Sequence, residues 1–206
     1  PGHPERADRL RAIEAALADA AFNALDRRDA PLADRAEVLR CHPEAYVARI
    51  EAAIPDEGWA SLDADTHLVA ASLDAALRGV GGCVAAVDAV IADDVANAFI
   101  AMRPPGHHAE PDTAMGFCLF GNVAIAAKRA LDHHGLSRVA VVDFDVHHGN
   151  GTQAILWDEA RVRFASTHQM PLYPGSGASH EIGTHGQITN VPLESGSGGA
   201  EMRAAF

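Results

Sequence analysis

Apolar residues in the first ninety positions recur at the spacing of a helix. Between residues 4 and 20, Leu10, Ile13 and Leu17 lie three or four positions apart, with a proline in the first turn and Glu5 near the positive end of the helix dipole. Similar spacing predicts a second helix over residues 43–54 and a long alanine-rich helix over residues 67–91, in which the glycines of residues 79–82 favour an interruption. The amino-terminal part is therefore predicted to be mainly helical.

The pattern changes after residue 95, where short continuous apolar runs replace the helical spacing. Runs at residues 96–103, 137–146 and 161–168 predict three buried strands. A helix is predicted between the first two, over residues 121–135, with Gly135 as its C-terminal cap. Residues 193–199 are predicted to be a strand-to-helix loop, and residues 200–206 the first turns of a helix. The alternation predicts an α/β fold with parallel strands, whose ligand site lies beyond the carboxyl ends of the strands.

The second predicted strand ends in the sequence DFDVH, which has acidic and imidazole side chains at alternate positions. Alternate residues of a strand share a face, so Asp143, Asp145 and His147 should project together, while Phe144 and Val146 face the packing side. Two neighbouring carboxylates repel one another in a crevice unless a cation, a shared proton or a basic group lies between them. A divalent metal would meet this need, and zinc accepts such oxygen and nitrogen ligands. The competing interpretation is an acidic strand end that only caps neighbouring loops.

The first predicted strand ends in RPPGHH, where PPG stops the strand and forms a rigid turn. This turn should present His107 and His108 to the same edge of the sheet. Adjacent imidazoles suit proton transfer near neutral pH. The other adjacent pair, His133 and His134, follows a predicted helix and is interpreted as a surface feature that the negative end of the helix dipole favours.

Composition narrows the class of protein. With 206 residues, 48% of them hydrophobic, residues 1–206 are predicted to form a single domain. A formal charge of −12 opposes binding to nucleic acid or to anionic membranes and favours cationic ligands. Three widely spaced cysteines and the lack of a long apolar segment predict a cytoplasmic protein. The first residue is a proline and the last predicted helix has no stop signal, so the sequence is expected to be clipped at both ends.

Together, the segments RPPGHHAEPDTAMGFC (residues 103–118) and VVDFDVHHGNGTQ (residues 141–153) resemble the histone deacetylase family, in its class II and bacterial deacetylase-like branch. The resemblance extends from GHPERADRL through THQMPLYPGSG and NVPLESGSG, and so covers essentially the whole chain. It implies an arginase/deacetylase-like three-layer α/β fold, with a central, mainly parallel sheet flanked by helices. It also implies zinc-dependent removal of acetyl groups from amines.

The resemblance also implies a role for each matching residue. Asp145 and His147 correspond to two of three zinc ligands, Asp143 to the carboxylate that orients His107, and His108 to the general base and acid. The partner of His108 would be Asn150, where class I members have an aspartate. The walls of the acyl-lysine channel would be Gly116, Phe117 and Tyr173, although both aromatic residues also fit plain core packing. A structural K⁺ would be held by Asp143, Asp145, His147, Ser166 and Thr167.

Two parts of the family pattern do not occur in the 206 residues: a later aspartate that supplies the third zinc ligand, and a later tyrosine. We therefore expect a fragment whose carboxy-terminal part is missing and which is inactive alone. The substrate is expected to be acetyl-lysine in protein or an acetylated polyamine. A rival of another class is a non-catalytic acyl-binding or interaction module, and self-association is left open.

Overall fold

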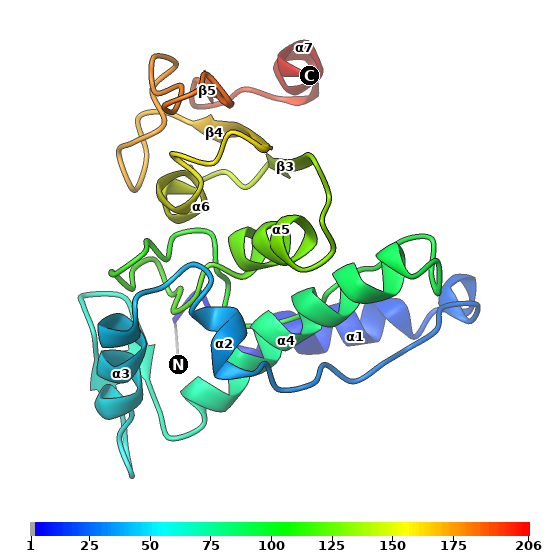
Figure 1. The fold of residues 1–206 in the computed structure, drawn as a ribbon, viewed down its shortest axis with the longest axis vertical. Helices are drawn as coiled ribbons and strands as arrows, with labels where there is room; N and C mark the ends of the chain where they lie inside the picture. The colour runs from blue at the N-terminus through cyan, green and yellow to red at the C-terminus, as the bar shows by residue number, and fades with distance from the viewer. Residues whose placement is uncertain (1–2) are drawn as a thin grey trace.

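The computed structural model describes residues 3–206 as a helical part followed by a small parallel sheet (Figure 1). The sheet has the order β3-β4-β5, and both pairs of neighbouring strands are parallel. The elements in chain order are α1 (Ala7–Leu17), the short 3₁₀ helix η1 (Ala20–Phe22), α2 (Arg35–Val38), α3 (Glu44–Ala53), β1 (Ala60–Ser61), β2 (His67–Leu68), α4 (Ser72–Ile91), α5 (Asn122–Asp132), β3 (Val139–Asp143), α6 (Asn150–Ile155), β4 (Val162–Gln169), β5 (Ile188–Leu193) and α7 (Gly199–Ala205). The predicted α/β class is confirmed.

Two apolar clusters form the core, and α5 contributes to both. One cluster lies among the helices and includes Tyr46, Phe120 and Ile125. The other lies between α5 and the sheet and includes Leu131 and Phe164. In Figure 1, α5 and α6 lie on one side of the sheet, and α4 lies beyond α5. The loop that carries His107 and His108 connects α4 to α5, and its last part adds Leu119 and Phe120 to the cluster among the helices.

The predicted helices are confirmed, with changes at their ends. In α1, Leu10, Ile13 and Leu17 are half-buried while the residues between them are exposed, as the spacing predicted. The long helix begins at Ser72, because residues 67–68 pair instead with β1. The expected interruption near residues 79–82 is wrong. A Cβ at position 81 would lie 2.0 Å from the carbonyl oxygen of Pro31, so Gly81 serves close packing within an unbroken helix.

The strand predicted over residues 96–103 is wrong. This segment is irregular and pairs with no strand among residues 3–206, and Phe99 is 73% exposed. A strand needs a neighbour for its backbone hydrogen bonds, which an apolar sequence cannot supply by itself. The other two predicted strands correspond to β3 and β4, while β5 and α6 were not predicted. The loop at residues 193–199 and the final helix are confirmed.

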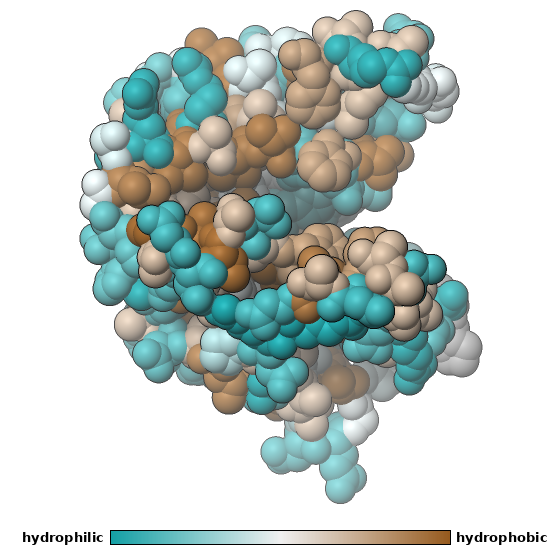
Figure 2. All heavy atoms as spheres, turned by 90° about the vertical axis from the view of Figure 1, so that its right-hand side faces the viewer, coloured by the Kyte–Doolittle hydropathy of each residue, from teal (hydrophilic) through white to brown (hydrophobic). Residues whose placement is uncertain are grey.

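A wide apolar surface remains open along α4, α5 and the start of β3. Figure 2 shows hydrophobic side chains bordering a deep indentation on this face of the molecule. A groove of about 440 Å³ is lined there by residues that include Val87, Val90, Ile100, Val123 and Leu136. Within residues 3–206, no helix is both long and apolar enough to cross a membrane.

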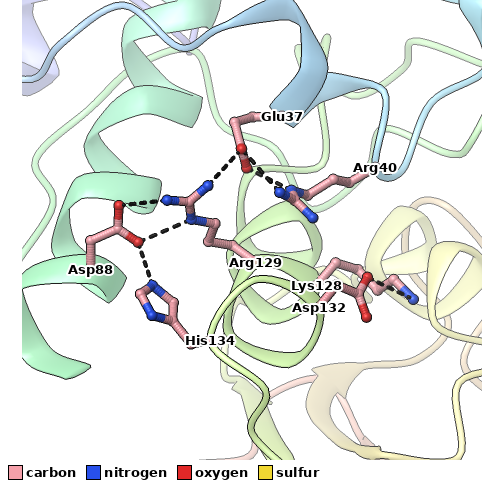
Figure 3. A network of polar contacts seen from close by, with 7 residues as sticks. All are labelled: Glu37, Arg40, Asp88, Lys128, Arg129, Asp132 and His134. Atoms are coloured by element: carbon pink, nitrogen blue, oxygen red, sulfur yellow. Dashed lines mark hydrogen bonds and ion pairs between the residues drawn. The ribbon is translucent and has the colours of Figure 1, made fainter. Parts of the chain in front are cut away.

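An ion-pair network joins α2, α4 and α5 (Figure 3). Arg129 of α5 lies between Glu37 and Asp88, with N–O distances of 2.8 and 3.0 Å. Arg40 pairs with the same Glu37 at 2.7 Å, and His134 lies 2.6 Å from Asp88. His134 therefore does more than occupy the surface after a helix, because it links the end of α5 to α4.

Candidate active site

The two histidines of the RPPGHH segment lie in a turn. Gly106 is required there, because a Cβ at this position would lie 2.7 Å from the carbonyl oxygen of Phe120. A backbone hydrogen bond joins this turn to α6, because the N–H of Thr152 donates to the carbonyl oxygen of His107 over 3.1 Å. The imidazole rings of His107 and His108 lie side by side, with centroids 4.0 Å apart. Packing against α6 therefore presents both rings beside the end of β3.

The acidic motif does not continue the strand, which corrects the predicted alternation. Strand β3 ends at Asp143, and the next residues form two tight turns. Asp143 accepts a hydrogen bond from the backbone N–H of Asp145 over 3.1 Å, and Asp145 accepts one from the N–H of His147 over 2.8 Å. Phe144 and Val146 are 70% and 53% exposed, so they do not face the packing side. Side chain–backbone turns, which Asp favours, produce the grouping.

His107 forms a close pair with Asp143, as predicted. Its Nδ1 lies 2.9 Å from Asp143 Oδ2, and both side chains are largely buried. Burial opposes the charged form of His107, but the hydrogen bond and negative charge of Asp143 outweigh it and raise the pKa of His107. Burial likewise opposes ionisation of Asp143, yet its contact with His107 keeps the pKa of Asp143 below the ordinary value. The pair therefore favours an imidazolium next to a carboxylate.

His108 is paired with the amide of Asn150. Its Nδ1 lies 2.8 Å from Asn150 Oδ1, and the two residues are only 4% and 6% exposed. Burial, followed by the positive charge of His107, lowers the pKa of His108 to about 4. Gly116, at φ +55°, leaves room for the ring, since a Cβ there would lie 2.4 Å from His108 Cδ2. His108 is thus a neutral imidazole held at a fixed orientation.

Asp145 and His147 lie beside these rings at the open edge of the site. Their side chains are 3.2 Å apart, and the rings of His147 and His108 are 5.9 Å apart. A carboxylate and an imidazole are ligands that zinc accepts, so this pair fits part of a zinc site. No group of three or more metal-ligating side chains occurs among residues 3–206, whereas catalytic zinc sites have three protein ligands.

Of the two predicted aromatic channel residues, Tyr173 lies beside this group. Its ring is 5.1 Å from that of His108 and 6.0 Å from that of His147. Burial, followed by the charges of Asp65 and Asp63, raises the pKa of Tyr173 to about 12. Phe117 has a φ of +69° and donates its N–H to Thr66 Oγ1. It is half-buried and lines a cavity of about 660 Å³ with His3, Trp59 and Arg103, whereas Tyr173 is 39% exposed and does not line that cavity. Neither ring belongs to the buried core.

Two residues of the predicted K⁺ site, Asp143 and Ser166, lie opposite one another where β3 pairs with β4. Ser166 Oγ lies 2.9 Å from His168 Nδ1. Thr167 Oγ1 is buried and has no hydrogen-bond partner among the described residues. An unpaired buried hydroxyl is costly, and a bound cation or water would satisfy it.

One residue of the site was not predicted. Glu110 follows His108 by two positions, and its carboxylate accepts a hydrogen bond from Asn150 Nδ2 over 2.8 Å. In the sequence it belongs to the quoted segment HHAEPD, but no local pattern links it to a residue forty positions later. Its contact arises only when the turn packs against α6.

Comparisons with known proteins agree with this geometry. The family model described as "Histone deacetylase domain" matches residues 3–206. An uncharacterized protein of Synechocystis is 43% identical, over all of this chain and 68% of its own. The "Histone deacetylase-like amidohydrolase" of Pseudomonas aeruginosa is 42% identical, over 96% of this chain and 53% of its own. The solved HDA15 HD domain has a TM-score of 0.87 and 37% identity, over 92% of this chain and 56% of its own. The chain thus spans about half to two thirds of the length of these relatives.

Proposed function

Because the chain belongs to the histone deacetylase family, we propose that it is a zinc-dependent amidohydrolase that removes acetyl groups from acetyl-lysine-type amides, and that residues 1–206 belong to one catalytic domain. The observation that carries the proposal is the neutral His108, held by Asn150 at 2.8 Å beside Asp145 and His147. This arrangement provides a base next to two metal-ligating side chains.

The histidines divide the proton chemistry between them. With Nδ1 donating to Asn150, Nε2 of His108 has a free lone pair and accepts a proton from the attacking water. The same nitrogen then returns the proton to the leaving amine. His107, whose charged form is favoured by Asp143, donates from its other ring nitrogen and stabilises negative charge that develops on the substrate oxygen.

Zinc would be held by Asp145 and His147 together with a third ligand from outside the described residues. When bound, zinc polarises a carbonyl group and lowers the pKa of water. A K⁺ ion would occupy the region of Asp143, Asp145, His147, Ser166 and Thr167, where the unpaired hydroxyl of Thr167 lies.

The substrate is proposed to carry its acetamide on an apolar stem. Gly116, Phe117 and Tyr173 would form the channel walls, and the charge of −12 favours a cationic molecule. Acetylated lysine and acetylated polyamines both fit.

The test compares hydrolysis of an acetyl-lysine peptide and an acetylpolyamine by the zinc-loaded protein. The expected result is faster hydrolysis of the peptide. A preference for the polyamine would reassign the substrate, and no hydrolysis of either by a protein that holds zinc with all three ligands would refute the amidohydrolase.

A non-catalytic acyl-binding module is a second candidate, which the finding of only two zinc ligands among residues 3–206 favours. It predicts binding of an acylated ligand without turnover. Zinc content and affinity for an aliphatic hydroxamate, measured for wild type and for His147→Ala, separate the two candidates. An amidohydrolase should bind the hydroxamate through zinc and lose that affinity in His147→Ala.

Asn150→Asp is expected to shift the pH dependence of the reaction. A carboxylate in place of the amide favours the imidazolium form, so the pKa of His108 should rise from its lowered value. Since neutral His108 is the base, the rising limb of kcat/KM should move to higher pH. A pH–rate profile identical to wild type would show that Asn150 does not act on His108.

A cytoplasmic location and the lack of binding to nucleic acid or membranes stay predictions from the sequence, and self-association is left open. Fractionation of the source cells and sedimentation of the purified protein would test them.

A further inference from the structure

The amide of Asn150 makes polar contacts on both of its sides. Its oxygen faces His108 Nδ1, while its nitrogen donates to Glu110 Oε1 over 2.8 Å and to the sulfur of Met115 over 3.3 Å. Glutamate as an anion can only accept hydrogen bonds, and a thioether sulfur is a weak acceptor. Both neighbours on the far side therefore require the NH₂ group of the amide.

The orientation of this amide decides which nitrogen of His108 carries the proton. When Oδ1 faces the ring, Nδ1 must be protonated and Nε2 keeps its lone pair. If the amide were rotated by half a turn, its NH₂ group would face Nδ1, and the proton of a neutral ring would move to Nε2. Asn150 and His108 are 6% and 4% exposed, so bulk water is not available to correct a wrong orientation.

Glu110 is placed for this contact by backbone bonds. Its N–H donates to the carbonyl oxygen of Thr113 over 3.0 Å, which closes the turn after the histidines. At Gly151, next to Asn150, a Cβ would lie 2.2 Å from the carbonyl oxygen of Ala109. The start of α6 and the backbone beside Glu110 are therefore in direct contact, and the distance between the carboxylate and the amide is determined by packing.

We propose that Glu110 is a positioning residue, whose carboxylate holds the Asn150 amide in the orientation that leaves Nε2 of His108 free to accept a proton. The inference rests on the proposed function in one respect only: the lone pair of His108 Nε2 is taken to act as the catalytic base. Glu110 acts on the reaction through Asn150.

The kinetic test makes each Glu110 substitution twice in the zinc-loaded protein, once in the wild-type sequence and once together with Asn150→Asp. Glu110→Met removes the acceptor and is expected to lower kcat by about 10- to 100-fold, the range for residues that orient a ligand or base, with a smaller change in KM. Glu110→Gln keeps an acceptor oxygen, so its loss should be smaller. In Asn150→Asp no NH₂ group remains and Glu110 faces a second carboxylate, so adding Glu110→Met should raise kcat above that of Asn150→Asp alone. This reversal of sign distinguishes positioning from a general structural effect.

An equal loss of kcat in both backgrounds, or no loss in either, would overturn the proposal. If Glu110→Met does not fold, adding Glu110→Gln to Asn150→Asp decides the question, because the glutamine NH₂ can donate to the new carboxylate. In that background kcat should again rise, and a fall would contradict the proposal.

A measurement that does not depend on catalytic turnover tests the role of Glu110 separately from the proposed function. ¹⁵N NMR of the His108 ring in the 206-residue chain should show the Nδ1–H tautomer in wild type and a mixture of tautomers in Glu110→Met. An unchanged tautomer in the variant would refute the role of Glu110. Absence of acetamide hydrolysis in a wild-type protein that holds zinc with all three ligands would refute the proposed function and leave this measurement valid.

Discussion

Replacing His108 by alanine is expected to lower turnover of an acetamide substrate by about 10²–10⁴-fold, the usual contribution of a general acid–base residue. The ring is buried and neutral, with Nδ1 bound to Asn150, so no neighbour can replace Nε2 as the proton acceptor. Zinc content should stay unchanged, because the proposed zinc ligands are Asp145 and His147. Steady-state kinetics together with metal analysis would measure both effects.

His133→Ala provides a matched control. This histidine is exposed and follows α5, so its loss should leave both turnover and zinc content as in wild type. Turnover by His108→Ala within a few-fold of wild type would remove His108 from the mechanism. Loss of zinc in His108→Ala would instead identify its ring as a metal ligand.

Glu37→Ala is expected to lower the free energy of unfolding by about 2–4 kcal/mol, slightly below the range for breaking a fully buried ion pair. Glu37 is 9% exposed and accepts hydrogen bonds from both Arg40 and Arg129 (Figure 3). Its removal leaves Arg129, which is also largely buried, with Asp88 as its remaining acidic partner. Urea unfolding at neutral pH would measure the change.

The Glu37 contribution should also depend on pH. The hydrogen bond from Arg40, opposed by burial, holds the pKa of Glu37 below its ordinary value. Such a group stabilises the fold above the pKa of the unfolded chain and loses that effect as pH falls through the folded pKa. The difference between wild type and Glu37→Ala should therefore shrink in acid.

Asp74→Ala is the control for the stability measurement. Asp74 forms an exposed pair with Arg78 four residues along α4, and such pairs contribute about 0.3–0.5 kcal/mol. A loss as large as that of Glu37→Ala would show that the network in Figure 3 has no special weight.

The sequence by itself determined the elements whose signals are local. Apolar spacing located α1, α3 and α5, and continuous apolar runs located β3 and β4, because each signal depends on neighbours within a few turns. The family motifs likewise identified the residues that gather at the site, from His107 and His108 to Asp143, Asp145, His147 and Asn150. These motifs are short, and the spacing between their residues can be read directly from the sequence.

Only the tertiary structure decided how those residues meet. The apolar run at residues 96–103 lacks a paired neighbour and remains irregular, and the DFDVH motif bends after Asp143. His107 meets Asp143 across 36 positions, and Asn150 meets Glu110 across 40. The physical reason is that strand pairing and buried polar contacts require partners from distant segments, which come together only when α5 and α6 pack against the sheet.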